Sequence, residues 1–313
     1  MSSIQVQAPG LLTTVQDLGR PGFGPIGVSP SGAADPISLR VGNRLVGNKE
    51  GAPGLEMMLL GGTFVFPQGA IVALTGSDFG AKLDDANVAV GTSVQMRPGQ
   101  TLRLGPTTSG ARCYLCVQGG IAVKPFLGSA STHILSGLGG FEGRPLRKGA
   151  VLRIGRASKR FRKRTVDPRA SENFSRRTIL RVTPGPQAGC FSESSRRAFY
   201  AGTYRVGEQS NRMGLRLEGA IVSLHSAREM ITEGVSLGAI QVPAGGSPII
   251  LFVEQQTTGG YPKIANVISA DLHRVGQLRP RDELRFEQVT FDAARALLIE
   301  QEKLLASREL ILE

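Results

Sequence analysis

Several residue types are scarce in this chain of 313 residues, and each scarcity excludes a class of protein. Trp is absent and aromatic residues make up 5%, so the chain lacks the stacking platforms of single-strand nucleic-acid binders. Apolar runs are short: Ile249 to Val253 has five residues, whereas a membrane-spanning helix needs about 20. The first ten residues contain no basic region followed by a long apolar stretch, so we expect no signal peptide and no membrane association.

Cysteine and histidine are also rare, with three residues of each. An odd, small number of cysteines makes no disulfide framework and favours a reducing, cytoplasmic location. Cys113 and Cys116 form a CxxC motif, but positions three apart on a strand point to opposite faces, so core packing is the better interpretation. His133, His225 and His273 have no partners at metal-ligand spacing, so we expect structural histidines and no metal site.

The common catalytic signatures are missing as well. The chain contains no GxxxxGK[ST] phosphate loop, no GxSxG nucleophile elbow and no HExxH zinc motif. It also has no segment that would present a lysine for biotin attachment. The chain alone is therefore not expected to hydrolyse ATP at a useful rate.

Glycine, in contrast, is abundant, with 41 residues, about twice the usual share of roughly 7%. Glycines between short alternating apolar segments predict many strands joined by tight turns, and hence a mainly β protein. A turn followed by apolar–Arg–apolar occurs three times, within Met96 to Gly105, Leu146 to Gly155 and Leu278 to Glu287. Period two places each arginine opposite its apolar neighbours, and the recurrence favours two related β-barrels in tandem over unrelated strands that happen to follow turns.

Two helices are predicted beside the strands. In Ala34 to Val46, Ile37, Val41 and Leu45 share one face, and Asp35 with Pro36 makes a cap and first-turn pair. The second helix is predicted over Phe291 to Leu312, with Thr290 as a candidate cap.

The net charge of +12 is concentrated in one stretch. Residues 156–177 hold nine basic and two acidic residues, a balance of +7, and few apolar ones. We interpret the stretch as a linker or loop between an N-terminal barrel lobe (1–155) and a C-terminal barrel lobe (178–313); a contact with an anionic partner or nucleic acid is the alternative. Charge in one loop without stacking aromatics predicts no sequence-specific binding of nucleic acid.

Four polar, glycine-bearing segments are candidate site loops, because polar groups that converge on a strand scaffold are typical of binding sites. They are TTVQDLGRPG at 13–22, GAAD at 32–35, QSNRMG at 209–214 and QQTTGGYPK at 255–263. Arg20, Arg212 and Lys263 can hold carboxylate or phosphate groups. Ordinary turn and capping residues are the alternative interpretation.

These segments carry a resemblance to a known family. Together with GVSPSGAAD, LRVGNRLVGN, ALTGSD, YLCVQGGI, GGFEGR, PGPQ, SNRMGLRLEG and EGVSLGAIQVP, they resemble the family of 5-oxoprolinase C subunits, also called the allophanate hydrolase subunit 2 or biotin-dependent carboxyltransferase family. The chain is also similar to the carboxyltransferase region of urea carboxylase. The match runs in order from about Val6 to Phe286, apart from the basic stretch. One departure is Glu254, where the family commonly has Asp before Gln-Thr-Thr.

The resemblance implies a fold and a function. It implies tandem cyclophilin-like β-barrels with a few short helices, and a protein that works with homologues of the B and A subunits of 5-oxoprolinase. The complex would open 5-oxoproline to glutamate with ATP and Mg²⁺ bound at the level of the complex. The alternatives are biotin-dependent carboxyl transfer to a urea-like amide, and a noncatalytic regulator that binds a homologue of the B subunit or of a kinase inhibitor.

Either chemistry needs anion holders and a base, so we expect the four loops to converge on one cleft for a small amide or lactam. The candidate catalytic residues are Asp17, Asp35, Glu254 and Lys263, and which carboxylate acts as base or metal ligand stays open. The candidate substrate-binding residues are Thr13, Thr14, Gln16, Arg20, Asn211, Arg212, Gln256, Thr257, Thr258, Gly259, Gly260 and Tyr261, the last as an aromatic lid. Because loop cations seldom support a core, truncation of Arg212 or Lys263 to Ala is expected to lower the activity of the complex roughly 100-fold without unfolding the chain.

Overall fold

The computed structural model describes residues 2–156, 160–174, 178–224 and 230–313. The chain forms two compact units, the first made of residues 1–20, 31–174 and 304–313 and the second of 21–30 and 175–303. Residues 157–159 and 175–177 of the basic stretch, and His225, lie outside the described residues. The lobe boundaries at 155 and 178 therefore stay predictions.

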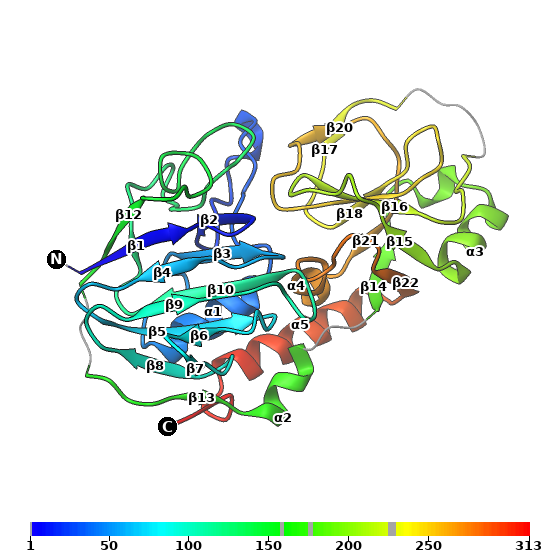
Figure 1. Ribbon diagram of the computed structural model, residues 1–313. Helices are drawn as coiled ribbons and strands as arrows, with labels where there is room; N and C mark the ends of the chain where they lie inside the picture. The colour runs from blue at the N-terminus through cyan, green and yellow to red at the C-terminus, as the bar shows by residue number, and fades with distance from the viewer. Residues whose placement is uncertain (1, 157–159, 175–177, 225–229) are drawn as a thin grey trace. The chain divides into compact units, whose positions relative to one another are not determined.

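The first unit contains two antiparallel sheets (Figure 1). The seven-stranded sheet has the order β11-β12-β1-β4-β9-β6-β7 and the five-stranded sheet the order β2-β3-β10-β5-β8. Their strands are β1 (Ser3–Ala8), β2 (Leu12–Gln16), β3 (Gly54–Met58), β4 (Thr63–Val65), β5 (Ala70–Gly76), β6 (Lys82–Leu83), β7 (Ala86–Asn87), β8 (Ser93–Met96), β9 (Thr101–Arg103), β10 (Arg112–Val117), β11 (Ile121–Ala122) and β12 (Val151–Ile154). The unit also holds α1 (Pro36–Leu45), α2 (Pro168–Ser171), η2 (Glu172–Phe174) and a ribbon of β13 (Thr165–Val166) with β23 (Ile311–Leu312).

Strand β10 lies at the centre of the five-stranded sheet, and all six of its residues are buried. Its alternate side chains enter two clusters, because successive residues of a strand face opposite ways. Cys113 packs with apolar residues of both sheets, whereas Cys116 packs with Leu39 and Leu45 of α1. Burial raises the pKa of the Cys116 thiol to about 12. Both thiols are core residues, as the spacing predicted.

The second unit is a closed barrel in the order β14-β21-β18-β19-β16-β15-β22, with a parallel pair of β14 and β22. Its strands are β14 (Ile179–Pro184), β15 (Tyr204–Val206), β16 (Gly214–Glu218), β18 (Ala239–Gln241), β19 (Ile249–Leu251), β21 (Lys263–Val267) and β22 (Glu283–Gln288), beside the ribbon of β17 (Glu233–Gly234) and β20 (Thr258–Gly259). The helices are η1 (Gly24–Ile26), η3 (Ala188–Cys190), α3 (Glu193–Ala201), η4 (Ser269–Asp271), α4 (Leu272–Val275) and α5 (Phe291–Ala306), and α5 continues into the first unit.

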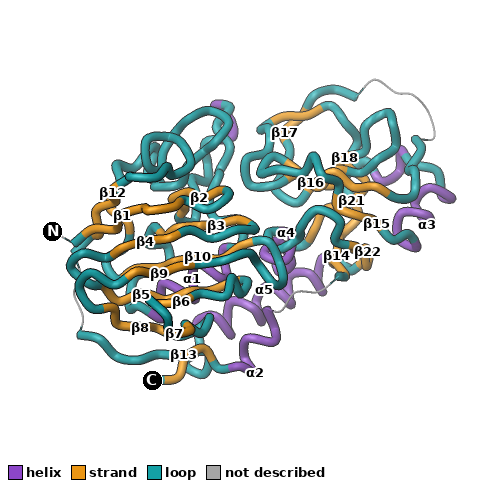
Figure 2. Tube along the Cα trace, viewed as in Figure 1, coloured by secondary structure: helices purple, strands orange, loops and turns teal. Residues whose placement is uncertain are grey.

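The mainly β prediction is confirmed, since strands dominate both units and the helices are few (Figure 2). Helix α1 is capped by Asp35, and the Thr290 hydroxyl accepts a hydrogen bond from Ala293 N at the start of α5. The predicted C-terminal helix was too long, because α5 ends at Ala306 and the chain then extends into β23. No helix in the described ranges is long and apolar enough to cross a bilayer.

The repeated turn–strand pattern follows the predicted alternation. In β9, β12 and β22 the leucine before each arginine is 1% exposed, while the arginines are exposed; the residues concerned are Leu102, Leu152, Leu284, Arg103, Arg153 and Arg285. Period two therefore identified the inward face of each strand correctly.

Candidate functional site

Most of the first candidate segment, Thr13 to Arg20, is buried, although Leu18 is exposed. The Thr13 hydroxyl donates to Pro9 O, and Gln16 Nε2 donates to Thr14 Oγ1 (3.0 Å) and Thr132 O (3.1 Å). Thr13, Thr14 and Gln16 are at most 1% exposed. Gln16 Oε1 is buried and accepts no hydrogen bond from the residues that the structure describes, which leaves one polar atom of this segment for a ligand or water.

Asp17 has all the partners that a carboxylate normally takes. Its oxygens accept hydrogen bonds from Gly19 N (2.8 Å), Ser129 Oγ (2.6 Å), Ala130 N (2.6 Å) and Ser131 Oγ (2.5 Å). Four donors stabilise the charged form and join the loop after β2 to residues 129–131. This geometry gives Asp17 a loop-holding role, and its role as a base stays a prediction.

Arg20 is similarly engaged with main-chain atoms. Its side chain is 2% exposed, Nη2 donates to Ser131 O, and Nε donates to Phe126 O (3.3 Å). The guanidinium carbon also lies 5.5 Å from the centre of the Phe126 ring, within the range of a cation–π contact. Arg20 therefore fixes the 126–131 loop instead of reaching out to solvent.

The GAAD segment lies against the first segment. Ala33 N donates to Asp17 O (2.8 Å), and Gly32 has a φ of +98° with Gly19 N so close that a Cβ would be 3.0 Å away. Asp35 is the N-cap of α1, since its carboxylate accepts from Ser38 N (2.9 Å) and Ser38 Oγ (2.6 Å). The first unit thus brings Thr13–Arg20 and Gly32–Asp35 together.

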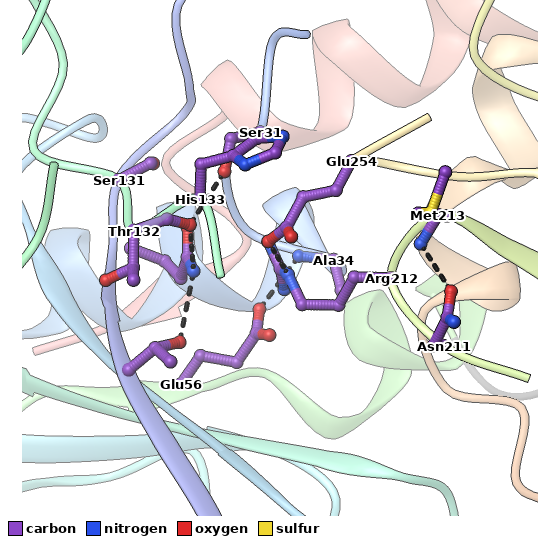
Figure 3. Close-up of polar contacts among 12 residues, drawn as sticks. Ser31, Ala34, Glu56, Ser131, Thr132, His133, Asn211, Arg212, Met213 and Glu254 are labelled. Carbon is purple, nitrogen blue, oxygen red and sulfur yellow. Dashed lines mark hydrogen bonds and ion pairs between the residues drawn. The ribbon is translucent and has the colours of Figure 1, made fainter. Parts of the chain in front are cut away.

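A buried carboxylate that the sequence analysis missed supports this loop. Glu56 on β3 accepts from Ala34 N (2.8 Å; Figure 3). It also accepts from Tyr114 Oη (2.7 Å), and Arg112 Nε lies 3.5 Å from its other oxygen. Tyr114 Oη in turn accepts from Asp35 N (2.7 Å). Burial, and then the neighbouring Glu56 charge, raise the pKa of Tyr114 well above its usual value, so the hydroxyl stays protonated and donates.

In the second unit, SNRMG forms a tight turn that places a buried ion pair. Asn211 Oδ1 accepts from Met213 N (2.8 Å), and Arg212 O accepts from Glu254 N (2.8 Å). Arg212 Nε donates to the Glu254 carboxylate, and both side chains are nearly inaccessible, at 6% and 1% exposed (Figure 3). The structure therefore joins SNRMG to the residues just before the QTTGGYPK segment.

Lys263 makes a second ion pair with a different character. Its Nζ contacts the carboxylate of Glu233 on β17, which also accepts from Gln187 Nε2 (2.6 Å). The lysine side chain is 5% exposed and the glutamate side chain 46%. The Lys263 hydrogen bond, and then the one from Gln187, lower the pKa of Glu233 below its usual range. The buried Lys263 ammonium therefore binds the carboxylate of Glu233, whose side chain is half-exposed.

Amide side chains surround the rest of QTTGGYPK. Gln241 Nε2 donates to Tyr261 O (3.3 Å), and Gln256 Nε2 to Gln241 Oε1 (3.5 Å). Gly259 lies against both amides, since a Cβ there would be 2.7 Å and 2.8 Å from their nitrogen atoms. Thr257 O accepts from Val235 N (3.1 Å), and Thr258 with Gly259 forms β20, opposite β17. Next to them, Gly260 leads into Tyr261, which is 49% exposed, and its role as a lid stays a prediction.

Three residues near Lys263 and Gln256 were missed from the sequence, although all of them lie in motifs that carried the family resemblance. Gln187 belongs to PGPQ and Glu233 opens EGVSLGAIQVP; Gln241 lies near the end of the same motif. No group of three or more His, Cys, Asp or Glu side chains in the described ranges is arranged to hold a metal ion. TTVQDLGR and GAAD belong to the first unit, and SNRMG and QTTGGYPK to the second, so their convergence on one cleft stays a prediction.

Comparison with known proteins gives relatives over nearly the whole chain. The chain is 39% identical to the C subunit of 5-oxoprolinase from Escherichia coli, over 93% of each chain. It is 37% identical to the corresponding 5-oxoprolinase C subunit of Haemophilus influenzae, over 91% of this chain and 90% of the relative. Urea amidolyase of Saccharomyces cerevisiae is 34% identical over 98% of this chain, which spans only 18% of that enzyme.

Solved structures and a family sequence model agree with these relatives. The Kluyveromyces lactis urea amidolyase matches 99% of this chain with a TM-score of 0.90 and 32% identity, over 21% of that protein. The urea carboxylase of the same yeast matches 99% with a TM-score of 0.89 and 32% identity, over 30% of that protein. Residues 26–288 match the family described as carboxyltransferase domain, subdomain A and B. The chain therefore belongs to this carboxyltransferase-domain family and, within it, to the family of 5-oxoprolinase C subunits that its motifs predicted.

Proposed function

We propose that this chain is the C subunit of an ATP-dependent 5-oxoprolinase, which opens 5-oxoproline to glutamate together with homologues of the A and B subunits. The observation that carries the proposal is the identity of 39% over 93% of both chains with the Escherichia coli protein named as the C subunit of 5-oxoprolinase. The urea amidolyase relatives are less identical and match over only 18% of their length, so they support the related carboxyl-transfer chemistry less strongly.

The chemistry of the substrate explains what the second unit would supply. A lactam is a poor electrophile, so ATP would activate its oxygen, and negative charge would develop where the ring opens. 5-Oxoproline also carries a carboxylate. Lys263 is a buried ammonium that already holds a carboxylate oxygen, and the Gln187 amide binds the same group. We assign this pair to the substrate carboxylate, with Gln241 and Gln256 next to the lactam amide.

The Arg212–Glu254 pair has a different role in this proposal. Both groups are buried and closed on each other, so neither is presented for direct contact with substrate while the pair lasts. We infer that the pair sets the position of the segment that continues into Gln256 and Gly259. Glu254 stays the candidate base of the second unit, and Asp35 and Asp17 hold the loops of the first.

The test is reconstitution with the A and B homologues encoded in the same genome. The proposal expects release of ADP and formation of glutamate that depend on 5-oxoproline and require all three proteins. The chain alone should give no steady ADP release. If A and B alone reach the full rate and this chain only changes their affinity or stability, it is a regulator, and the proposal is wrong.

A second function is favoured by the match of residues 26–288 to the carboxyltransferase domain and by the TM-score of 0.89 with urea carboxylase. In that case the chain would transfer a carboxyl group from carboxybiotin on another protein to a urea-like amide. The same preparation, mixed with a biotin carboxylase, biotinylated carrier, MgATP, labelled bicarbonate and urea, distinguishes the two. Incorporation of label into urea without any turnover of 5-oxoproline would replace the first proposal by the second.

A further inference from the structure

The arginine-rich stretch between the predicted lobes has no role in the proposed function, yet its described part is held firmly in the first unit. Ser93 N donates to Arg164 O (2.8 Å), and Arg164 N donates to Ser93 Oγ (2.8 Å). The next residues form β13, which pairs with β23, and Asp167 N donates to Leu310 O (3.0 Å). The arginines of residues 160–164 are therefore positioned against the C-terminal residues and the end of α1.

Two neighbouring cavities open at this place, and Arg164 lines both. One, of about 440 Å³, has a strongly basic wall that contains Arg44, Asn48, Arg164 and Arg308, with Glu313 at its side. The other, also about 440 Å³, combines an apolar wall of Leu45, Val46, Ile71 and Phe161 with the Gln118 amide and with Arg160, Arg162 and Arg164. A basic cavity next to one that has an apolar wall and further arginines suits a ligand with one charged and one apolar end.

The protein's own Glu313 carboxylate lies at the basic cavity and contacts arginines there, as a bound oxyanion would. Glu313 Oε1 accepts from Arg164 Nε (2.9 Å) and Nη2 (2.7 Å), and Oε2 accepts from Arg162 Nη1 (3.3 Å). The Glu313 side chain is half-exposed, so it is a weakly held occupant. Glu313, with Glu50 near Arg44, leaves much of the charge of Arg44, Arg162, Arg164 and Arg308 unbalanced.

Arg44 shows the same deficit of negative charge. Its Nη2 donates to Ser307 O (2.8 Å), while Nη1 is buried and has no hydrogen-bond acceptor among the residues that the structure describes. Burial lowers the pKa of Arg44, Glu50 opposes this, and the charges of Arg40 and Arg164 lower it further. A buried donor without an acceptor is costly, and a bound anion would remove that cost.

The carbonyl groups at the C-terminal end of α1 do not cancel the attraction of the arginines for an anion. A helix C-terminus repels anions through its unpaired carbonyl oxygens. Here Arg44 O accepts from Arg164 Nη1 (3.3 Å), and Val46 O accepts from Gln118 Nε2 (3.2 Å). Because these carbonyls already have donors, the arginines dominate the local field.

We propose that the first unit binds a nucleotide-type ligand, with its phosphate groups on Arg44, Arg164 and Arg308 and its ring against the apolar wall of the other cavity, beside Phe161. Phosphates suit this place better than a single carboxylate, since several arginines can each bind a separate phosphate oxygen and guanidinium pairs well with phosphate. The site binds only: the chain has no phosphate loop for hydrolysis. It is independent of the proposed 5-oxoprolinase reaction.

The test is calorimetric titration of the full chain, without its partner proteins, using ATP, tripolyphosphate and adenosine as probes. We expect ATP to bind more tightly than tripolyphosphate, and both more tightly than adenosine, with affinity that falls as salt rises. Arg164→Met and Arg308→Met should each weaken ATP binding by about tenfold or more, the effect of losing one charge-assisted contact. Arg97→Met removes an exposed arginine outside both cavities and should change nothing.

One variant should raise the affinity for ATP instead of lowering it. It therefore distinguishes binding at this site from a general effect of the positive net charge. Glu313→Gln removes the resident carboxylate, so it should strengthen ATP binding, whereas a nonspecific effect of net charge would make Arg97→Met weaken binding as much as Arg308→Met. Far-UV circular dichroism and thermal unfolding without ligand confirm that each variant is folded. No binding of ATP by the folded chain, equal binding of adenosine, or equal losses in Arg97→Met and Arg308→Met would each overturn the proposal.

Discussion

The charged residues of the candidate loops are used in different ways in the two units. In the first unit, Asp17, Arg20 and Asp35 bond mainly to main-chain atoms and nearby hydroxyls of their own and neighbouring loops. In the second unit, Arg212 and Lys263 bond to carboxylate side chains. A charge that holds main chain shapes a loop, whereas a side-chain ion pair can exchange its partner for a ligand.

The two ion pairs of the second unit differ again in exposure. Arg212 and Glu254 are both buried, so a ligand would have to open a desolvated pair. Glu233 reaches Lys263 from a half-exposed position, so a substrate carboxylate could take its place at little cost. The comparison therefore makes Lys263 the strongest candidate for an anion holder, and Arg212 a residue that supports the fold.

The largest effect is expected from opening the buried pair. Arg212→Ala leaves the Glu254 carboxylate buried without its partner, which should lower the free energy of unfolding by about 3–5 kcal/mol. This changes the expectation from the sequence that Arg212 could be truncated without harm to folding. Urea denaturation measures it, and the double variant Arg212→Met, Glu254→Leu is the control, because it removes both charges and should lose much less. Equal losses would mean that packing, not charge burial, matters here.

The second largest effect is expected at Asp17, and it tests whether this carboxylate holds the loops of the first unit together. Asp17→Asn keeps the size of the side chain but replaces a carboxylate that accepts four hydrogen bonds, so unfolding should become easier by about 3 kcal/mol. Asp78→Asn is the matched control, since the Asp78 carboxylate accepts a main-chain bond from Gly80 N at an exposed turn. If both variants lose the same small amount in thermal denaturation, Asp17 is free for chemistry and the contrast between the units fails.

Much of the fold was predictable because it depends on local patterns. Period-two alternation identified the buried leucines of β9, β12 and β22, and the Asp35–Pro36 pair identified the start of α1. The end of α5 was not predictable from its leucines, because Leu305 and Leu310 are both buried but on opposite sides of the break at Ala306. Apolar residues continue across that break, so the pattern does not reveal where the helix stops.

The site was predictable in its segments but not in its pairings. The four loops could be selected from their polar residues and glycines, yet Glu233 is 30 residues from Lys263 and Glu254 is 42 from Arg212. Such partners are fixed by β17–β20 and by the turn at Asn211, which a single sequence does not specify. The same reason hides Glu56, since an isolated glutamate in an apolar strand gives no sign of the main-chain amide of Ala34 that it binds.

A smaller effect is expected for the Lys263–Glu233 pair. It concerns the rate of turnover rather than the free energy of unfolding. Lys263→Met should lower turnover of 5-oxoproline by the reconstituted complex about 100-fold, through lost stabilisation of anionic groups. Its effect on unfolding should stay small, because Glu233 remains partly hydrated. Steady-state rates and thermal denaturation of the same preparations measure both. The exposed lysine Lys82 supplies the control variant Lys82→Met, and a normal rate in Lys263→Met would remove Lys263 from the site.

The smallest effect is the pH dependence that Glu233 contributes. Its pKa in the folded chain lies below the usual 4.5, first because of the hydrogen bond from Lys263 and then because of Gln187. A lowered pKa means that the folded state favours the charged carboxylate. The stabilisation is therefore complete above about pH 4.5 and disappears as the pH falls through the lower, folded value.

This predicts how variants should behave in urea. The difference in unfolding free energy between the natural chain and Glu233→Gln should be constant from pH 7 to pH 5 and should shrink toward zero as the pH falls further. In a Lys263→Met background, Glu233→Gln should produce a much weaker pH dependence, because the cation that lowers the pKa is gone. If the pH dependence is unchanged without Lys263, then Gln187 alone orders the carboxylate. Lys263 would then have no measurable effect on the ionisation of Glu233, and the contrast between the Lys263–Glu233 and Arg212–Glu254 pairs would be lost.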